Sequence, residues 1–66
     1  MERERLKGFI DKFYNDEPAL GTRSILLRFV TDLWAASYIS NEDWKWCKDY
    51  IHEKYMEVLR EIYPNP

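Results

Sequence analysis

The amphipathic pattern with the widest apolar arc runs from Thr22 to Ile39, TRSILLRFVTDLWAASYI. When its positions are stepped at about 100° per residue, as in an α-helix, the apolar side chains spread over roughly 220° of the circumference. A helix with one buried face needs an apolar arc of only about 100°. The pattern therefore predicts a helix over residues 22–39 that packs between two neighbours, with Leu33 fully buried near the middle of its arc.

A second amphipathic segment, residues 2–14, has a narrower apolar stripe. Its apolar positions follow the i, i+3, i+4, i+7 spacing of one helix face and are Leu6, Phe9, Ile10 and Phe13. Charged residues surround the stripe, so we expect this helix to be covered on one side only. The helix must end before Pro18, which disfavours helical geometry in the residue before it, and Thr22 is then a suitable N-cap for the next helix.

The third segment, residues 41–63, begins at the clearest boundary signal in the chain. Ser40 and Asp43 have the spacing of a capping box, and Ile39 and Trp44 have that of a hydrophobic staple. Pro64 ends the helix. Its apolar stripe, at spacings of three and four, consists of Trp44, Cys47, Ile51, Tyr55, Val58 and Ile62.

The order of these segments predicts an all-α fold. The expected helices lie at about 2–14, 22–39 and 41–63 and are joined by two short connections. Short connections favour a compact three-helix domain, either an up-down-up bundle or an orthogonal trio. We expect the second helix to be central. The chain is long enough for one domain, 1–66, which buries only about 60% of its unfolded surface. Three Trp, five Tyr and three Phe offset that small size because each aromatic buries a large area.

Composition argues against several classes of function. The net charge of −2, from 10 basic and 12 acidic residues, disfavours nucleic-acid binding, which depends on neutralising phosphates. A single cysteine, Cys47, cannot form an internal disulfide, and small secreted domains usually need several. The sequence has neither the ~18-residue apolar run of a membrane span nor the apolar core of a signal peptide. We therefore expect a cytoplasmic protein that does not enter a membrane.

Candidate chemical groups are few and poorly spaced. Asp49, His52 and Glu53 could be read as metal ligands, but bundles that bind metals take such groups from several helices. Cys47 and His52 point about 140° apart on one helix, so they cannot act as a nucleophile and its base. Residues 21–24 could hold a phosphate at a helix start, although an ordinary cap is the simpler interpretation. We expect no catalytic, metal or cofactor site and no small-molecule substrate.

The most informative feature outside the apolar stripes is a pair of aromatic residues on the polar face of the third segment. Trp46 and Tyr50 lie at about 200° and 240° from Trp44, opposite the apolar stripe, and Glu53 and Glu57 continue their face. Three interpretations are open. The rings are simply left exposed in a small domain, or the first helix or its following loop covers them, or they anchor a partner, since Trp and Tyr dominate binding hot spots. We predict exposed rings and a partner-binding face of Trp46, Tyr50, Glu53 and Glu57.

Together these patterns favour a non-enzymatic protein–protein interaction module. The expected role is a small cytoplasmic adaptor, regulator or inhibitor of a larger protein, of a kind that a phage or plasmid could encode. Its partner would be another protein or a second copy in a homodimer. The alternative is a small nucleic-acid-binding transcriptional regulator, although the third segment carries more acidic than basic residues. Retention on heparin or DNA at low salt would distinguish the two.

Overall fold

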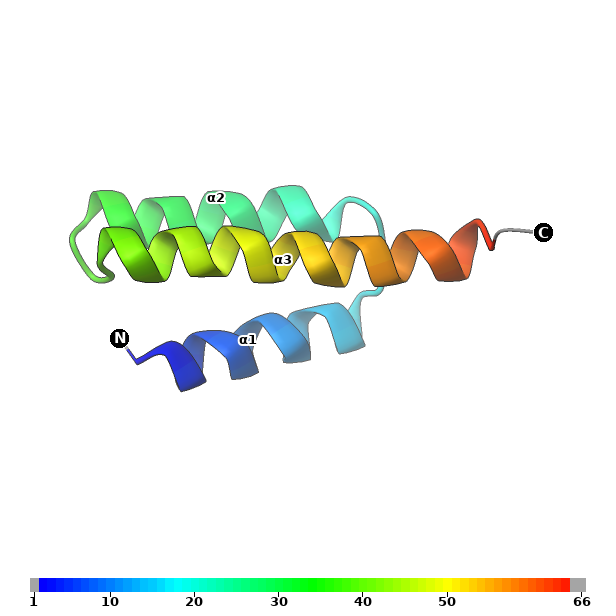
Figure 1. Ribbon diagram of the computed structural model, residues 1–66, viewed down its shortest axis with the longest axis horizontal. Coiled ribbons are helices and arrows are strands. Elements are labelled where there is room, and N and C mark those ends of the chain that lie inside the picture. Colours follow the sequence, from blue (N-terminus) through cyan, green and yellow to red (C-terminus); the bar gives the residue numbers. More distant parts are fainter. Residues whose placement is uncertain (1, 65–66) are drawn as a thin grey trace.

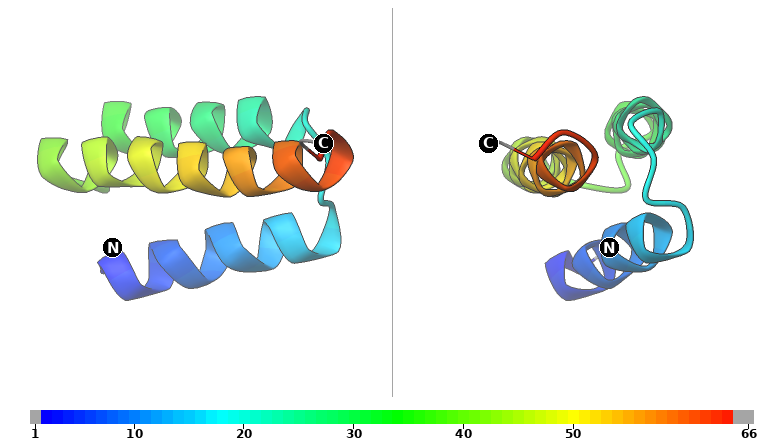
Figure 2. Two further views of the ribbon diagram at one scale, coloured as in Figure 1. Left: turned by 45° about the vertical axis from the view of Figure 1, so that its right-hand side comes forward. Right: turned by 90° about the vertical axis from the view of Figure 1, so that its right-hand side faces the viewer.

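Three α-helices make up the protein, shown as a computed structural model in Figure 1. The structure describes residues 2–64, and that part of the chain contains no strand. Helix α1 covers Arg3–Asp16, α2 covers Thr22–Ala35 and α3 covers Asn41–Ile62. Successive helices run in opposite directions, and viewed end-on they occupy the corners of a triangle (Figure 2). The prediction of a compact all-α three-helix domain is confirmed, with Met1, Asn65 and Pro66 outside the described residues.

The central helix is α3, not α2. Contact between α2 and α3 is the most extensive, α1 packs mainly on α3, and α1 and α2 touch least. The expectation that the second helix is central is therefore wrong. With 22 residues against 14 in each neighbour, α3 is the longest helix, and it offers one flank to α2 and another to α1.

The core lies along the line where the three helices meet. Its buried apolar residues are Leu6, Ile10, Tyr14, Leu26, Val30, Ile39, Cys47, Ile51 and Val58. The Tyr14 hydroxyl donates a hydrogen bond to the Ile51 carbonyl at 3.4 Å, so its polar end is satisfied inside the core. Leu33 is only partly buried, which corrects the prediction that it is fully enclosed, because it lies in the last turn of α2 at one end of the bundle.

Helix α2 ends four residues earlier than predicted. Ser37 has a φ of 64°, the left-handed conformation that closes a Schellman motif. Within that motif the Tyr38 amide donates to the Leu33 carbonyl at 2.9 Å, and the Ser37 amide donates to the Trp34 carbonyl at 3.0 Å. The apolar pattern continues through this turn because Ile39 folds back and is buried in the core, so periodicity alone overestimated the helix.

The boundary of α3 agrees with the capping prediction. The Asp43 amide donates to the Ser40 hydroxyl at 3.1 Å, which confirms Ser40 as the N-cap. Two acidic residues in the first turn, Glu42 and Asp43, lie at the positive end of the helix dipole. The helix ends at Ile62, one residue before the predicted end.

The connection between α1 and α2 differs from the prediction at Thr22. This residue is the first of α2, and the N-cap position belongs to Gly21. Its hydroxyl is buried and donates to the Glu17 carbonyl at 2.7 Å, which ties the loop to the helix. The predicted N-cap role of Thr22 is therefore wrong. Its hydroxyl is engaged in the hydrogen bond to the Glu17 carbonyl. Helix α1 continues to Asp16, two residues beyond the predicted end.

Candidate functional site

The predicted partner-binding aromatics, Trp46 and Tyr50, stack on each other on the α1 side of α3. Their ring centroids are 5.0 Å apart and the planes are almost parallel, at 8°. The Arg3 guanidinium lies 5.2 Å from the centroid of the Trp46 ring, a cation–π distance. Arg3 also pairs with Asp43 at 3.0 Å, so the first turn of α1 is attached to the first turn of α3.

Tyr50 is held by a polar cluster between α1 and α3. Its hydroxyl donates a hydrogen bond to the Asp11 carboxylate, and the Lys54 ammonium lies 3.5 Å from the same carboxylate. Lys54 also lies 5.6 Å from the centroid of the Tyr50 ring. Burial raises the pKa of the Tyr50 phenol, and the hydrogen bond to Asp11 raises that pKa further because ionisation would leave two anions facing each other. Tyr50 therefore acts here as a neutral donor.

These contacts correct the expectation that Trp46 and Tyr50 lie largely exposed. Both rings are partly buried and pack against the core, so the structure matches the interpretation in which the first helix covers them. Two residues of α1 make this cover: Arg3 lies over the face of the Trp46 ring, and Asp11 accepts the hydrogen bond from the Tyr50 hydroxyl. The partner-binding role of Trp46 and Tyr50 stays a prediction, now confined to the ring edges that α1 leaves open.

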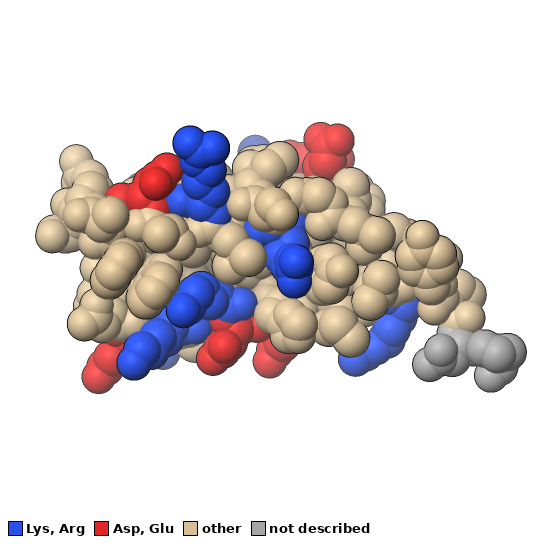
Figure 3. Space-filling view, turned by 90° about the horizontal axis from the view of Figure 1, so that it is seen from above, with Lys and Arg blue, Asp and Glu red and all other residues tan. Residues whose placement is uncertain are grey.

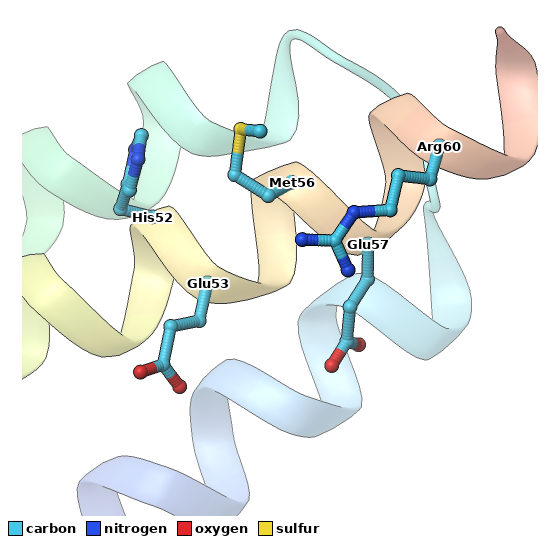
Figure 4. Close-up of a pocket in the computed structure, with 5 residues that line it drawn as sticks. All are labelled: His52, Glu53, Met56, Glu57 and Arg60. Atoms are coloured by element: carbon cyan, nitrogen blue, oxygen red, sulfur yellow. The ribbon is translucent and has the colours of Figure 1, made fainter. Parts of the chain in front are cut away.

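Glu53 and Glu57, which complete the predicted face, are both exposed. They border a shallow surface depression of about 240 Å³ whose lining residues all belong to α3 and are His52, Glu53, Met56, Glu57 and Arg60. In Figure 4 the two carboxylates extend toward α1, whereas His52 and Met56 point to the opposite side. The Glu57 carboxylate lies 3.8 Å from the Lys54 ammonium. These side chains diverge, so the depression has no group of polar atoms converging on one point.

The groups considered for metal or nucleophilic chemistry remain separate in space. Among residues 2–64, no three His, Cys, Asp or Glu side chains are placed to hold a metal ion. The Cys47 thiol is buried, and burial, followed by the nearby Asp43 charge, raises its pKa to about 11. A thiol with such a pKa is protonated at neutral pH and is a poor nucleophile. Cys47 is thus a small buried core residue, as its place in the apolar stripe predicts.

Aromatic side chains also hold α2 against α3, near the turn that joins them. The Trp34 and Trp44 rings stack at 4.2 Å and 10°, and the Lys48 ammonium lies 3.7 Å from the Trp44 centroid. The Trp44 indole donates to the Thr31 hydroxyl at 3.2 Å, and the Trp34 indole donates to the side-chain carbonyl of Asn41. The indole N–H groups of Trp34 and Trp44 therefore both have a hydrogen-bond acceptor. Figure 3, viewed from the α2 side, shows a surface that is mostly uncharged.

Sequence reasoning missed an apolar surface across α1 and α2, in which Phe9 and Ile25 are exposed and Phe13 and Phe29 are partly buried against the core. We call it the phenylalanine face, and its members are Phe9, Phe13, Ile25 and Phe29. The Phe9 ring stacks on Phe29 at 4.7 Å and meets Phe13 at 5.9 Å. Phe9 is nevertheless 41% exposed and Ile25 is 57% exposed. The signal was present in the 220° apolar arc of the second segment, which is wider than the described neighbours cover.

Comparisons with known proteins gave no match to this chain. No protein-family model matches the chain, and the searches of curated proteins and of solved structures found no significant match either. Within residues 2–64, no helix combines the length and the apolarity that spanning a membrane requires. The functional argument therefore depends on the surfaces of the molecule itself.

Proposed function

We propose that this protein is a non-enzymatic protein–protein interaction module that binds through the phenylalanine face. The observation that carries the proposal is the exposure of Phe9 and Ile25 around the stacked Phe9–Phe29 pair. Covering the exposed parts of Phe9 and Ile25 would recover a fraction of the roughly 1.5–3 kcal/mol that full burial of such a side chain contributes. A surface of adjoining apolar side chains on two helices is typical of a site that another molecule covers.

The chemistry of the face suits a protein partner better than a small ligand. Aromatic residues are enriched in the centres of protein interfaces, and charged residues are depleted there. The face has this composition, with its charged neighbours Arg5 and Asp32 on the outer sides of α1 and α2. Small-molecule sites instead combine a concave apolar cavity with converging polar groups. The depression on α3 lacks that convergence, as Figure 4 shows.

Within this proposal the protein is a small cytoplasmic adaptor, regulator or inhibitor of a larger protein. Its small size supports such a role, because a 66-residue domain can occupy one site on a partner without adding an activity of its own. A reducing compartment fits the buried free thiol of Cys47. The predicted residues Trp46, Tyr50, Glu53 and Glu57 lie on the other side of α1 from the phenylalanine face and would form a second, weaker contact area.

A pair of matched isoleucine variants tests the proposal. Ile25 on the phenylalanine face is 57% exposed, and Ile62 at the end of α3 is 45% exposed, so the two are comparable in type and exposure. We expect Ile25→Asp to lose the partner that the wild-type protein captures from a lysate of its source cells, while Ile62→Asp retains it. Circular dichroism would confirm that both variants fold. Equal capture by the two variants would overturn the assignment of binding to this face.

A further inference from the structure

We propose that α1 undocks from the α2–α3 pair and unfolds as one unit, while α2 and α3 stay folded against each other. The domain then has an open state besides the closed state of Figure 1. Three features support the open state: the weak ends of α1, the contacts that hold α2 on α3 without α1, and the water-accessible polar contacts that attach α1 to α3. The open state itself does not depend on the proposed function.

Helix α1 has few features that would keep it helical on its own. Glu2 occupies its N-cap position, but within residues 2–64 that side chain makes no capping hydrogen bond. The helix ends in Asp16, without a basic residue in its last turn, and the helix dipole disfavours an anion there. Gly8 lowers helix propensity in the interior of the helix. A 14-residue helix of this kind is marginal in water once its neighbours are removed.

Helices α2 and α3 are held together by contacts in which α1 takes no part. Ser37 closes the C-terminus of α2 with its φ of 64°, and Ser40 caps the N-terminus of α3. Trp34 stacks on Trp44, and the Trp44 indole donates to the Thr31 hydroxyl. The contact between α2 and α3 is also the most extensive of the three helix pairs. All of these contacts can persist when α1 leaves.

The attachment of α1 combines a buried row with polar contacts at the surface. Its buried side chains are Leu6, Ile10 and Tyr14. Arg3 pairs with Asp43 at 3.0 Å and Lys54 pairs with Asp11 at 3.5 Å, and all four side chains are between 26% and 48% exposed. Ion pairs that water reaches so easily contribute little to stability. Contact between α1 and α2 is the least extensive, so the buried row must offset most of the entropy lost in ordering 14 residues.

Opening exchanges one candidate surface for the other. The phenylalanine face takes Phe9 and Phe13 from α1, so it is complete only in the closed state. The Trp46 and Tyr50 rings are covered by α1 in the closed state and become accessible in the open one. A partner on the phenylalanine face would hold α1 in place, because a ligand stabilises the state that it binds. This last step alone rests on the proposed function.

Native-state hydrogen exchange of the full-length protein tests the open state. We compare the protection factors of the Ile10 and Phe13 amides, in α1, with those of the Ile51 and Tyr55 amides, in the middle of α3. Exchange through the open state gives the two α1 amides similar protection, about tenfold or more below that of the α3 amides. Protection of α1 equal to or above that of α3 overturns the proposal, because α1 would then open only with the rest of the domain.

Two variants separate the opening of α1 from unfolding of the whole domain. Ser40→Ala weakens the α2–α3 pair in the closed and open states alike, so it should speed exchange of the α3 amides about fivefold and leave the α1 amides unchanged. Tyr50→Phe removes the hydroxyl that donates to Asp11 and so weakens only the closed state. It should speed exchange in both helices by the same factor. If Ser40→Ala speeds both helices equally, the domain opens as one unit and the proposal is overturned.

These outcomes are independent of the proposed function, because exchange is measured on the protein alone. Uniform protection across the three helices would overturn the open state and leave the capture experiment with Ile25→Asp and Ile62→Asp as it stands. Equal capture by those two variants would overturn binding through the phenylalanine face and leave the exchange result unchanged.

Discussion

The two sides of α2 are anchored very differently. Toward α3, its side chains take part in the Trp34–Trp44 stack, the hydrogen bond from Trp44 to Thr31 and the contact of the Arg23 guanidinium with the Tyr55 ring, 4.4 Å from its centroid. Toward α1, its ring contact is the pairing of Phe29 with Phe9, and Ile25 beside them is exposed.

This difference separates the side of α2 that stabilises the fold from the side that we propose for binding. The side toward α3 combines burial with polar partners that fix each ring in one orientation. The side toward α1 has apolar area without such partners, so nothing specifies its packing beyond shape. We therefore expect substitutions on the first side to change the free energy of unfolding and those on the second to change association.

The largest expected effect comes from two neighbours in sequence on α2. Leu26 is fully buried, whereas Ile25 is 57% exposed. Leu26→Ala should reduce the free energy of unfolding by about 2–5 kcal/mol, because it leaves a cavity in the core. Ile25→Ala should cost less than about 1 kcal/mol. Urea titrations of both variants at low protein concentration measure the contrast, and similar midpoints would remove the distinction between the two sides of the helix.

A second pair compares the two attachments of α1. Trp46→Ala removes the ring that contacts Arg3 and stacks on Tyr50, and we expect it to cost about 2–3 kcal/mol. Phe9→Ala, on the half-exposed side, should cost about 1 kcal/mol. Thermal melts followed by circular dichroism compare the two. A larger loss from Phe9→Ala would mean that α2, rather than α3, is the main support of α1.

The Ser40 N-cap of α3 should contribute about 1 kcal/mol to the free energy of unfolding. Ser40→Ala removes the acceptor of the Asp43 amide and should lower stability by about that amount, while Ser40→Asp keeps an acceptor and should be tolerated. Chemical denaturation of the three proteins gives the comparison. The prediction fails if alanine and aspartate prove equally harmless.

At Ser37 we expect one substitution to increase the stability of the fold rather than reduce it. Its left-handed backbone, with a φ of 64°, is strained for a residue with a Cβ atom and natural for glycine. Ser37→Gly should therefore raise the free energy of unfolding by about 0.5–1 kcal/mol, and Ser37→Val should lower it. Differential scanning calorimetry would detect both shifts, and a lower melting temperature for the glycine variant would contradict the proposed cap.

The change in stability that is smallest at neutral pH comes from ionisation of the Cys47 thiol. Its folded-state pKa of about 11 lies above the unfolded value near 8.5, so the folded state favours the protonated thiol. Its contribution to stability should be complete below about pH 8.5 and should fall as the pH rises toward 11. Denaturation of wild type and Cys47→Ala at pH 7 and pH 10 isolates this term. A wild type that loses no stability relative to the variant at pH 10 would argue against a buried thiol.

The sequence predicted the helices well because their signals are local. The Ser40 cap and the proline positions mark breaks that the backbone chemistry imposes within a few residues. The error at the end of α2 has a physical cause, because Ile39 keeps the apolar rhythm while leaving the helix to enter the core. A pattern of hydrophobicity records which residues are buried, not whether they reach the core from a helix or from a turn.

The candidate site was harder to predict because it depends on how the helices are placed. The angles around α3 put Trp46 and Tyr50 opposite the apolar stripe, but only the tertiary fold shows that Arg3 and Asp11 reach them. The same placement leaves Phe9 open, although its spacing marks it as a core residue. The spacing of residues within one helix cannot reveal which of two flanks a neighbouring helix will cover.

The attachment of α1 to α3 also has a consequence for the time at which the fold can form during synthesis. Arg3 meets Asp43, 40 residues later in the chain, and Asp11 meets Tyr50, 39 residues later. At translation rates of about 5–20 residues per second, α1 is synthesised roughly 2–8 s before these partners. During that interval α2 is made as well, but it gives α1 only the least extensive of its helix contacts, around the Phe9–Phe29 pair. The first helix made is therefore the last to be secured, and the nascent chain depends on its C-terminal third to complete the domain.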